Sequence, residues 1–453
     1  MSKNKLKIAL IHPDYNNKVY ETLSAPLGLC WISSSLKEIN DFDVYCYDFA
    51  KDIELILTFK VKEYDIICIQ LHSQETLKEN LLYISQIKSE NPDVTIVVGG
   101  IASELNTNYI ITRDYIDILC LGEGEDTLPE LCLALYNNKD LSSVKGILYK
   151  TINNDIIHTG LREISVNIDS LPLPDREGFG IDYPQWSIIT ARGCPFDCRF
   201  CSVPQICKNK VRYRDINKVY EEIRFLHDTY NMKKFFILDD TFTINKKRTI
   251  ELCELLTNLK DIEWTCVTRA DMIDEEMLTK MKSAGCIQIS CGIESANNDI
   301  QSIINKNLNI DKVLLNLKNA KKIGLRVRCS FIFGLPGEEE KHIKKSIKFM
   351  CDLMPNEVQI YPYVPYNETE IFKEPEKYGL DLNSYHFLDK KDLFSPFIET
   401  KLLKREKLKE LSELCIKKLK LKGYLWIPGD VPAIKQSLEY VVMTEFAPVQ
   451  TLC

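Results

Sequence analysis

Short strand-like runs alternate with helix-patterned segments throughout the first third of the chain. Five runs have the length and pattern of strands: LKIALIHP (6–13), DVYCYDF (43–49), YDIICIQL (64–71), DVTIVVGG (93–100) and YIDILCLGEGE (115–125). Helical spacing of apolar residues falls at 25–39, 79–91 and 126–137. This alternation is typical of a parallel sheet, in which each helix returns the chain to the same edge. The sequence therefore predicts a doubly wound, Rossmann-like α/β domain over residues 1–140.

The loops that follow these strands carry glycines and histidines. Doubly wound sheets bind ligands in the crevice beyond the carboxyl ends of their strands, and glycine lets the backbone approach a bulky ligand closely. We therefore expect one ligand cleft at this edge of the sheet. Its predicted lining consists of His12, Leu71, His72, Ser73, Gly99, Gly100, Gly122 and Gly124.

The composition is that of a soluble globular protein with two or three domains. The chain has 453 residues, more than one hydrophobic core normally organises. Hydrophobic residues make up 45% and charged residues 27%, and the net charge of −7 disfavours a general nucleic-acid binder. No apolar run reaches the roughly 20 residues that span a bilayer, and the start MSKNKLKIALIHPDY lacks signal-peptide features. We expect a cytoplasmic protein without a membrane span or a nucleic-acid partner.

Three cysteines lie within eight positions in ITARGCPFDCRFCSVP (189–204). The C-x3-C-x2-C spacing fits structural zinc poorly, because structural zinc takes four protein ligands, and catalytic disulfide chemistry would need only two thiols. Thiolates also hold iron–sulfur clusters, and three of them leave one iron of a four-iron cluster open. We therefore predict Cys194, Cys198 and Cys201 as cluster ligands. Cys207 is an alternative fourth ligand, although its distance along the chain favours a structural role.

The segments around the cysteine motif differ in character. The prolines and glycines of DSLPLPDREGFGIDYPQ (169–185) predict a linker, which we place over 141–185, and WSIITARG (186–193) predicts a strand. Near the end, KLLKREKLKELSELCIKKLKLKGYL (401–425) has the spacing of an amphipathic helix. Its interleaved acids Glu406, Glu410 and Glu413 favour a packed, solvated helix over a membrane or nucleic-acid surface, and Cys453 is expected to be an inert terminus.

The cysteine loop, with an aromatic residue before its third cysteine, resembles that of the radical S-adenosylmethionine enzymes. The resemblance continues in order through FFILDDTFTINKKR (235–248), CVTRADMIDEEMLTKMKSAGCIQISCGIESAN (266–297), RVRCSFIFGLPGEEE (326–340) and VQIYPYVPYNET (358–369). It implies a partial (β/α)6 barrel over residues 186–375, followed by a mostly helical segment over 376–453. It also implies a [4Fe–4S] cluster, S-adenosylmethionine and an external one-electron reductant of the flavodoxin or ferredoxin type.

The same resemblance implies roles for individual residues. Asp239, Asp240 and Glu294 would accept hydrogen bonds from the amine and ribose of the cofactor, since carboxylates are strong acceptors. Gly334 and Gly337 would pack on its adenine. Arg269 and Arg328 are candidates for its carboxylate, although long arginines are more often ion-pair residues. Tyr361, Tyr363 and Tyr366 would line a substrate pocket or belong to the core.

The amino-terminal domain is similar to the cobalamin-binding domain that precedes this barrel in one branch of the superfamily. The segments PLGLCWISSSLKE, YDIICIQL, VVGGIASE and LGEGEDTLPEL carry the match in order. The D-x-H-x-x-G motif that supplies a cobalt ligand in other cobalamin domains is missing from the sequence, as it is from many members of this branch. His12 and His72 are possible substitutes, or polar loop residues. A second departure is PYNETEIF (365–372), where the family often has Pro-Gly before the threonine.

The two resemblances together imply a cobalamin-dependent radical S-adenosylmethionine methyltransferase. Such an enzyme methylates an unactivated carbon or a phosphinate phosphorus through methylcobalamin and a 5′-deoxyadenosyl radical. The substrate would be a small molecule or a peptide. Three alternatives remain: a rearrangement, ring contraction or cyclisation without methyl transfer; a partner-docking amino-terminal module without cofactor; and a sulfur-inserting methylthiotransferase.

Overall fold

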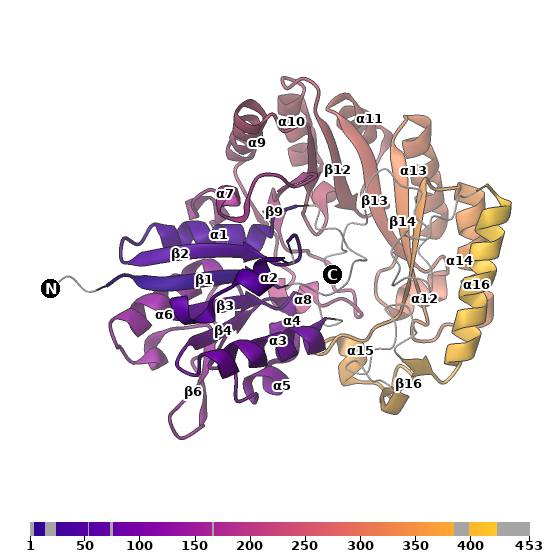
Figure 1. Ribbon diagram of the computed structural model, residues 1–453. Helices are drawn as coiled ribbons and strands as arrows, with labels where there is room; N and C mark the ends of the chain where they lie inside the picture. Colours follow the sequence, from indigo (N-terminus) through magenta and orange to yellow (C-terminus); the bar gives the residue numbers. More distant parts are fainter. Residues whose placement is uncertain are drawn as a thin grey trace. The chain divides into compact units, whose positions relative to one another are not determined.

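A computed structural model of the protein describes residues 4–13, 24–52, 54–72, 76–164, 167–384 and 398–423. Two residues singled out from the sequence, Ser73 and Cys453, lie outside these ranges. The described chain falls into two compact units, residues 4–184 and residues 185–423 (Figure 1). Each unit has its own sheet, and each is considered by itself.

The first unit is built on a seven-stranded sheet with the order β2-β1-β3-β4-β5-β6-β7. Its strands are β1 (Leu6–His12), β2 (Phe42–Asp48), β3 (Ile66–Gln70), β4 (Thr95–Gly99), β5 (Ile118–Cys120), β6 (Ile147–Lys150) and β7 (Ile156–His158). The first five are parallel, as the alternating sequence predicts. The chain reverses its direction across the sheet between β1 and β3, so the carboxyl ends of these strands form the switch point at which such folds bind ligands.

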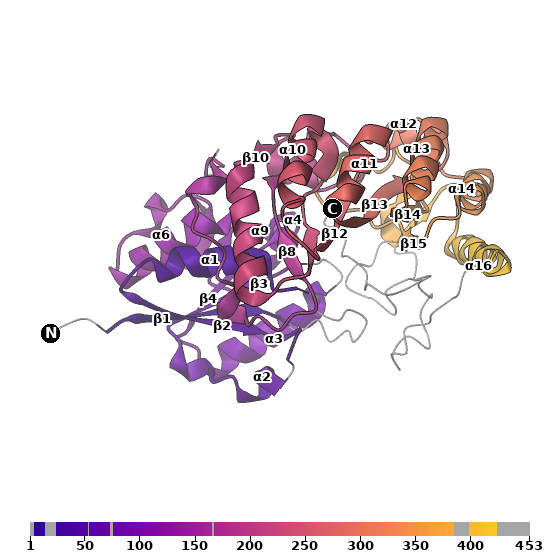
Figure 2. The same ribbon diagram turned by 90° about the horizontal axis from the view of Figure 1, so that it is seen from above.

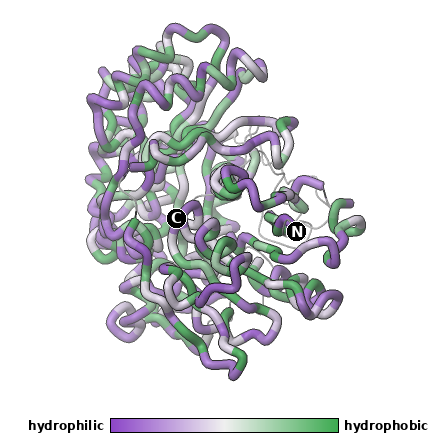
Figure 3. Tube along the Cα trace, turned by 90° about the vertical axis from the view of Figure 1, so that its left-hand side faces the viewer, coloured by the Kyte–Doolittle hydropathy of each residue, from purple (hydrophilic) through white to green (hydrophobic). Residues whose placement is uncertain are grey.

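Helices cover this sheet where the sequence has helical spacing. They are α1 (Leu27–Lys37), α2 (Glu54–Thr58), α3 (Leu77–Glu90), α4 (Ile101–Leu105), α5 (Thr107–Ile111), α6 (Gly124–Tyr136), α7 (Arg176–Phe179) and the 3₁₀ turns η1 (Val61–Glu63), η2 (Leu141–Ser143) and η3 (Ile168–Ser170). Hydrophilic and hydrophobic residues alternate along the helices in Figure 3, which is the pattern of helices with one buried face.

The segment 141–185, which its prolines and glycines mark as a linker, belongs to the first unit. It supplies β6 and β7, an antiparallel hairpin at the sheet edge. It is also tied to α1 by Asp175, which accepts hydrogen bonds from Ser33 Oγ at 2.5 Å and Lys37 Nζ at 2.6 Å. Strands at a sheet edge are often short and half-exposed. They therefore lack the long apolar run by which a strand is recognised in a sequence.

The second unit is built on six parallel strands in the order β15-β14-β13-β12-β11-β8. These are β8 (Trp186–Ile188), β11 (Lys234–Ile237), β12 (Glu263–Thr268), β13 (Cys286–Glu294), β14 (Arg326–Phe333) and β15 (Glu357–Pro362). The helices between them are α8 (Val203–Cys207), α9 (Ile216–Tyr230), α10 (Lys246–Leu256), α11 (Glu275–Ser283), α12 (Asn298–Ile303), α13 (Ile310–Lys322) and α14 (Glu340–Leu353), with the turn η4 (Phe242–Ile244) and the short pair β9 (Ala191–Arg192) and β10 (Arg212–Tyr213). The predicted partial barrel of six βα units is confirmed.

The two faces of this six-stranded sheet differ in polarity. One face carries Ile289, Cys291, Val327 and Cys329, which pack in a single core with residues of α11, α13 and α14. Figure 2 shows these helices along the outer side of the strands. Side chains alternate between faces along a strand. The opposite face, which we call the inner face, therefore carries the intervening residues, and many of these are polar.

The last described part of the second unit packs on the barrel. It contains α15 (Glu370–Lys373), β16 (Leu380–Asp381), η5 (Leu382–Ser384), β17 (Glu399–Thr400) and α16 (Arg405–Leu421). The predicted amphipathic helix is α16, whose Leu408, Leu411, Cys415 and Leu419 are buried. It lies beside α14 in Figures 1 and 2, and Lys407 pairs with Glu340 of that helix at 3.1 Å. Among the described helices, none has the length and apolarity to cross a membrane.

Candidate active site

The cysteine loop runs from β9 to α8 and is anchored at both ends. Gly193, at its start, has φ of +92°, and a Cβ there would overlap the carbonyl oxygen of Lys210. Only glycine lets the chain enter the loop in this conformation. Cys194, Cys198 and Cys201 are all half-buried. Phe200 is buried and packs in a small core with Cys198 and Cys201 at its edge, so one wall of the loop is apolar.

The donor set of this loop fits a four-iron cluster better than a single metal ion. Within the described ranges, no three His, Cys, Asp or Glu side chains are arranged to hold one ion. In a cluster each thiolate binds a different iron, so the three sulfurs need not converge on one point. Burial raises the pKa of the Cys194 thiol to about 11, and ligation by iron would displace that proton.

Cys207 is held against the loop backbone rather than turned away from it. Its Sγ accepts from Cys194 N and donates to Cys194 O, both at 3.4 Å. These two contacts give hydrogen-bond partners to both the N–H and the C=O group of Cys194, the first cysteine of the motif. The geometry therefore supports the structural role that the spacing favours.

The two neighbouring aspartates after β11 have different surroundings. Asp239 accepts from Thr190 N at 2.7 Å, from Ala191 N at 3.1 Å and from the Thr190 hydroxyl. It is buried, and burial raises its pKa to about 6. Asp240 accepts from Gly193 N at 2.9 Å, directly before Cys194, and burial raises its pKa as well. Asp239 therefore holds the strand that leads into the loop, and Asp240 lies beside the cysteines.

Glu294 ends β13 in a left-handed conformation, with φ of +62°. The pairing of β13 with β14 shifts register between Gly292 and Glu294, so a bulge redirects this side chain. Lys306 Nζ lies 2.6 Å from Glu294 Oε1. A Cβ on Gly292 would lie 2.8 Å from Lys306 Nζ and would overlap the carboxylate, so glycine at 292 leaves room for the ion pair over the inner face.

Lys306 is a candidate site residue that the sequence analysis missed. It lies on the turn after α12, between Asn305 and Asn307, whose φ values are +54° and +55°. Asn305 Nδ2 donates to Asp197 O at 2.7 Å, which joins this turn to the cysteine loop. Arg199 N donates to Ile304 O at 3.0 Å, which makes a second link between them. Two asparagines flanking a lysine indicate a tight turn. This pattern is the feature of the sequence that could have pointed to Lys306.

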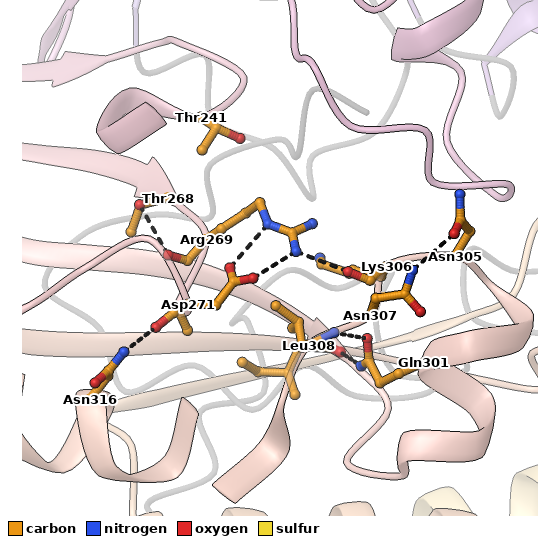
Figure 4. A network of polar contacts seen from close by, with 12 residues as sticks. Thr241, Thr268, Arg269, Asp271, Gln301, Asn305, Lys306, Asn307, Leu308 and Asn316 are labelled. Carbon is orange, nitrogen blue, oxygen red and sulfur yellow. Dashed lines mark hydrogen bonds and ion pairs between the residues drawn. The ribbon is translucent and has the colours of Figure 1, made fainter. Parts of the chain in front are cut away.

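Arg269 stabilises the same turn through its guanidinium group. Its guanidinium makes a bidentate pair with Asp271 at 3.1 and 2.9 Å and donates to Lys306 O at 2.9 Å (Figure 4). It also lies over the ring of Phe196, within the cysteine loop, at 3.8 Å. The ion-pair role that the sequence suggests for arginines therefore accounts for this residue.

Gly334 and Gly337 have local packing reasons for being glycine. Both have positive φ, +90° and +75°. A Cβ on Gly334 would lie 3.1 Å from Leu408 of α16, and a Cβ on Gly337 would lie 2.6 Å from Ile303 of α12. Glu338 closes this turn by accepting from Gly334 N at 2.8 Å and Leu335 N at 3.3 Å.

The tyrosines of β15 and its following loop divide between two environments. Tyr363 is buried in the small core that contains Phe200. Tyr361 lies on β15 two residues after Gln359, so it shares the inner face of the sheet. Tyr366 follows in the loop, where its carbonyl oxygen accepts from Thr369 Oγ1 at 2.7 Å. Of the three tyrosines, Tyr361 therefore lies where a residue lining a substrate pocket is expected, and Tyr363 is a core residue.

The glycines at the carboxyl edge of the first sheet serve different purposes. Gly100 has φ of +97°, and a Cβ there would lie 2.7 Å from Leu71 O. Gly99 has ordinary contacts, and a Cβ on Gly124 would lie 2.8 Å from Ile32 of α1. Gly122 differs, since with φ of +73° its Cβ would meet no described atom within 4 Å. Its backbone hydrogen-bonds to the Glu104 carboxylate, and the space beside its α-carbon is open, so a ligand could approach it closely there.

His12 ends β1 at the switch point. Its Nδ1 is 2.8 Å from Asp48 Oδ1, at the end of β2, and Tyr183 donates to Asp48 Oδ2 at 2.7 Å. Burial opposes ionisation of Asp48, but its hydrogen bonds with His12 and Tyr183 outweigh burial and lower its pKa. His72 follows β3 in the next loop of the same edge. The edge thus brings both histidines and the glycines of β4 and β5 into neighbouring loops.

Comparisons with known proteins agree with both units. A B12 binding domain model matches residues 16–132, and a Radical SAM superfamily model matches residues 188–350. An uncharacterized methyltransferase of Pyrococcus horikoshii is 31% identical over 383 residues, covering 81% of this chain and 83% of that protein. The anaerobic magnesium-protoporphyrin IX monomethyl ester cyclase of Rubrivivax gelatinosus is 26% identical over 420 residues, covering 84% and 73%.

A solved structure shares the fold. The radical S-adenosylmethionine methyltransferase TsrM of Kitasatospora setae, with cobalamin and a [4Fe–4S] cluster bound, has a TM-score of 0.67 at 16% identity, covering 83% of this chain and 76% of that one. The fold and the cysteine loop define a radical S-adenosylmethionine enzyme. With its B12 binding domain, the chain belongs to the cobalamin-binding branch of that superfamily, whose cofactors are a [4Fe–4S] cluster, S-adenosylmethionine and cobalamin.

Proposed function

We propose that the protein is a cobalamin-dependent methyltransferase that methylates an unactivated carbon or a phosphinate phosphorus of a small molecule or peptide. The observation that carries the proposal is a loop of three half-buried thiols, joined by hydrogen bonds to the turn whose lysine pairs with Glu294. The methyltransferase relative, 31% identical over most of both chains, supports methyl transfer over other outcomes.

When bound, the cluster and S-adenosylmethionine supply a 5′-deoxyadenosyl radical, and cobalamin supplies a methyl carrier. Cys194, Cys198 and Cys201 hold the cluster in this proposal. Asp240, next to Gly193 and Cys194, accepts from the amine of S-adenosylmethionine. Asp239 keeps the entering strand in register through Thr190 and Ala191.

Glu294 and Lys306 act as a pair on the inner face. The carboxylate is positioned to accept from the ribose hydroxyls, and the ammonium offsets the negative charge gathered by three thiolates and two carboxylates. Gly334 and Gly337 shape the loop beyond β14. On the first unit, the cobalamin contacts are assigned to His12, Leu71, His72, Ser73, Gly99, Gly100, Gly122 and Gly124, among which Gly122 has open space beside its α-carbon.

The domain assignment follows the same proposal. Residues 1–140 form the cobalamin domain, and the segment 141–185 extends its sheet with β6 and β7 before the chain enters the barrel of 186–375. The segment 376–453 sets the substrate specificity. An external one-electron donor of the flavodoxin or ferredoxin type reduces the cluster. Such donors and such clusters belong to the reducing cytoplasm.

A second candidate is ring formation without methyl transfer. Its support is the cyclase of Rubrivivax gelatinosus, which is 26% identical over 84% of this chain. This reaction also consumes a radical generated from S-adenosylmethionine. It produces 5′-deoxyadenosine without S-adenosylhomocysteine, so the two functions differ in one product.

The test is product analysis after anaerobic reconstitution with iron, sulfide and cobalamin. Reductant and S-adenosylmethionine are added, and S-adenosylhomocysteine and 5′-deoxyadenosine are quantified by mass spectrometry. Methyl transfer predicts both products, while 5′-deoxyadenosine alone favours the cyclase-like reaction. A variant with Cys194, Cys198 and Cys201 changed to alanine must form no 5′-deoxyadenosine, because only the cluster cleaves S-adenosylmethionine reductively, and C207A is the matched control that retains activity.

A further inference from the structure

The inner face of the barrel sheet carries a polar row that the proposed cofactor contacts do not use. Val267, Ser290, Arg328 and Glu357 are successive partners across β12, β13, β14 and β15. Their flanking residues Ile289, Cys291, Val327 and Cys329 face the helices. Because side chains alternate along each strand, Ser290, Arg328 and Glu357 all extend to the inner face at the same level.

The guanidinium of Arg328 is held on one side by a carboxylate of the same row. Arg328 Nε donates to Glu357 Oε2, and Arg326 Nη2, from the row below, donates to Glu357 Oε1 at 3.1 Å. The Arg326 side chain is half-exposed, whereas Arg328 is only 1% exposed, so the charge of Arg328 is screened little by water. Glu357 therefore fixes a charged guanidinium deep inside the unit.

Two buried donors of this row have no partner among the described residues. These are Arg328 Nη1 and Ser290 Oγ, on register partners of neighbouring strands. Ser290 is 7% exposed. A buried polar atom without a hydrogen bond destabilises the fold, so two such atoms on residues paired in register across neighbouring strands indicate a binding function. Ser330, on the same face, is different because its Oγ donates to Gln359 at 3.0 Å.

This row lies deeper in the barrel than the proposed cofactor contacts. Gly292 is two residues beyond Ser290, and the Glu294–Lys306 pair lies over it. Two residues of a strand span about 7 Å. The row below contains Thr265, Gln288 and Arg326 in register, so Arg328 is not in the last layer of the barrel. The unpartnered donors thus lie about two residues deeper than the proposed cofactor contacts.

We propose that Arg328 and Ser290 form a subsite for an oxyanion of the substrate, either a carboxylate or a phosphonate. Nη1 of Arg328 and the Ser290 hydroxyl donate to it, and Glu357 fixes the guanidinium from the other side. Charge-assisted hydrogen bonds of this kind are the strong ones in proteins. The subsite deepens the proposed function, on which it rests, because it fixes the inner end of the substrate and leaves its other end at the level of Glu294.

The test measures anion binding rather than turnover. Full-length protein carrying its cluster is titrated anaerobically with sodium acetate and with sodium methylphosphonate at constant ionic strength, and thermal stability is followed. Saturable stabilisation gives the dissociation constant of each probe. Ser290→Ala is expected to weaken binding roughly tenfold or more, because one hydrogen bond to a charged group is lost. Ser330→Ala is the matched control, since its hydroxyl is engaged by Gln359.

A second variant guards against misfolding. Arg328→Met alone would leave Glu357 with one cation, so it is combined with Glu357→Gln, which keeps an acceptor for Arg326. This double variant is expected to abolish saturable binding while remaining folded by circular dichroism. Wild-type affinity in S290A and in the double variant would overturn the proposal. So would equal losses in S290A and S330A, or no saturable binding to the wild type.

S-Adenosylmethionine has a carboxylate of its own, which makes it the other source of an oxyanion. Its affinity is therefore measured in the same variants, and an unchanged value in S290A supports assignment to the substrate. A parallel loss of S-adenosylmethionine binding would contradict that assignment. Neither measurement needs cobalamin or a methyl acceptor, so failure of the methyl-transfer assay and failure of this subsite are distinguishable.

Discussion

Lys306 Nζ lies 2.6 Å from Glu294 Oε1, and both side chains are 9% exposed. The two residues come from separate elements, the end of β13 and the turn after α12. Their contact joins the cysteine loop, through Asn305 and Asp197, to the bulge that ends β13. The pair is therefore the point at which the proposed cluster and cofactor contacts meet.

Replacing Lys306 by methionine should destabilise the protein by about 3–5 kcal/mol, because it leaves a buried carboxylate without its cation. Denaturant unfolding measures the loss, and equilibrium dialysis should show weaker S-adenosylmethionine binding. Lys280→Met removes an exposed pair with Glu254 and should cost about 0–1 kcal/mol. Equal effects in the two variants would show that the Glu294–Lys306 pair has no special role.

Glu338→Gln should change the pH dependence of stability. Burial raises the pKa of Glu338 to about 8 from its ordinary value of 4.5, so the folded protein holds a proton that the unfolded chain releases. Stability should fall as the pH rises from about 4.5 through about 8, by at most about 1.4 kcal/mol per pH unit. The glutamine keeps an acceptor for Gly334 N and Leu335 N and removes this dependence.

The matched control for that experiment is Glu339→Gln. Glu339 lies at the surface, where its pair with Lys341 lowers its pKa. Melting temperatures at pH 6 and pH 9 should converge in E338Q and stay apart in E339Q. A wild-type slope in E338Q would show that Glu338 is already ionised in the folded protein.

Two glycine substitutions should separate folding from cobalamin binding. Gly100→Ala places a Cβ 2.7 Å from Leu71 O at φ of +97° and should destabilise the first unit by about 1–3 kcal/mol. Gly122→Ala meets no described atom within 4 Å, so it should cost only about 1–2 kcal/mol of backbone strain.

If the cofactor occupies the open space beside Gly122, G122A should nevertheless lose cobalamin. The measurement is the amount of cobalamin, read by absorbance, that stays bound to G122A and to the wild type after gel filtration. Full retention by a folded G122A protein would place the cofactor elsewhere on the edge.

Cysteine substitutions should distinguish ligands from supports. Cys198→Ala should prevent stable cluster assembly, since two thiolates remain on the loop. Cys207→Ala removes only the two 3.4 Å contacts with the Cys194 backbone, so iron and sulfide content after reconstitution should stay near wild type. A cluster lost equally in both variants would make Cys207 a ligand.

The sequence predicted the parts of the structure that rest on periodicity and spacing. The five parallel strands of the first sheet and α16 follow from apolar patterns that burial enforces, whereas the six strands of the barrel were expected from the resemblance of ordered motifs. The edge hairpin β6–β7 was not predicted because its strands have only 4 and 3 residues, too few to show a period, and pair antiparallel at the edge of the sheet.

Roles within the candidate site were harder to predict than its location. Asp239 and Asp240 are adjacent in sequence, yet one binds the backbone of Thr190 and Ala191 and the other that of Gly193. Strand register decides this difference, and it cannot be read from residue types. Lys306 and Arg269 acquire their neighbours through a turn whose path depends on two left-handed asparagines.

The turn between α12 and α13 donates to the cysteine loop through Asn305 and accepts from it at Ile304. The cysteine loop and the turn that carries Lys306 are therefore held in one frame, without any contact between Lys306 and a cysteine being needed. The distance between the proposed cluster ligands and the Glu294 carboxylate is thus fixed by hydrogen bonds to the backbone rather than by the flexible lysine side chain.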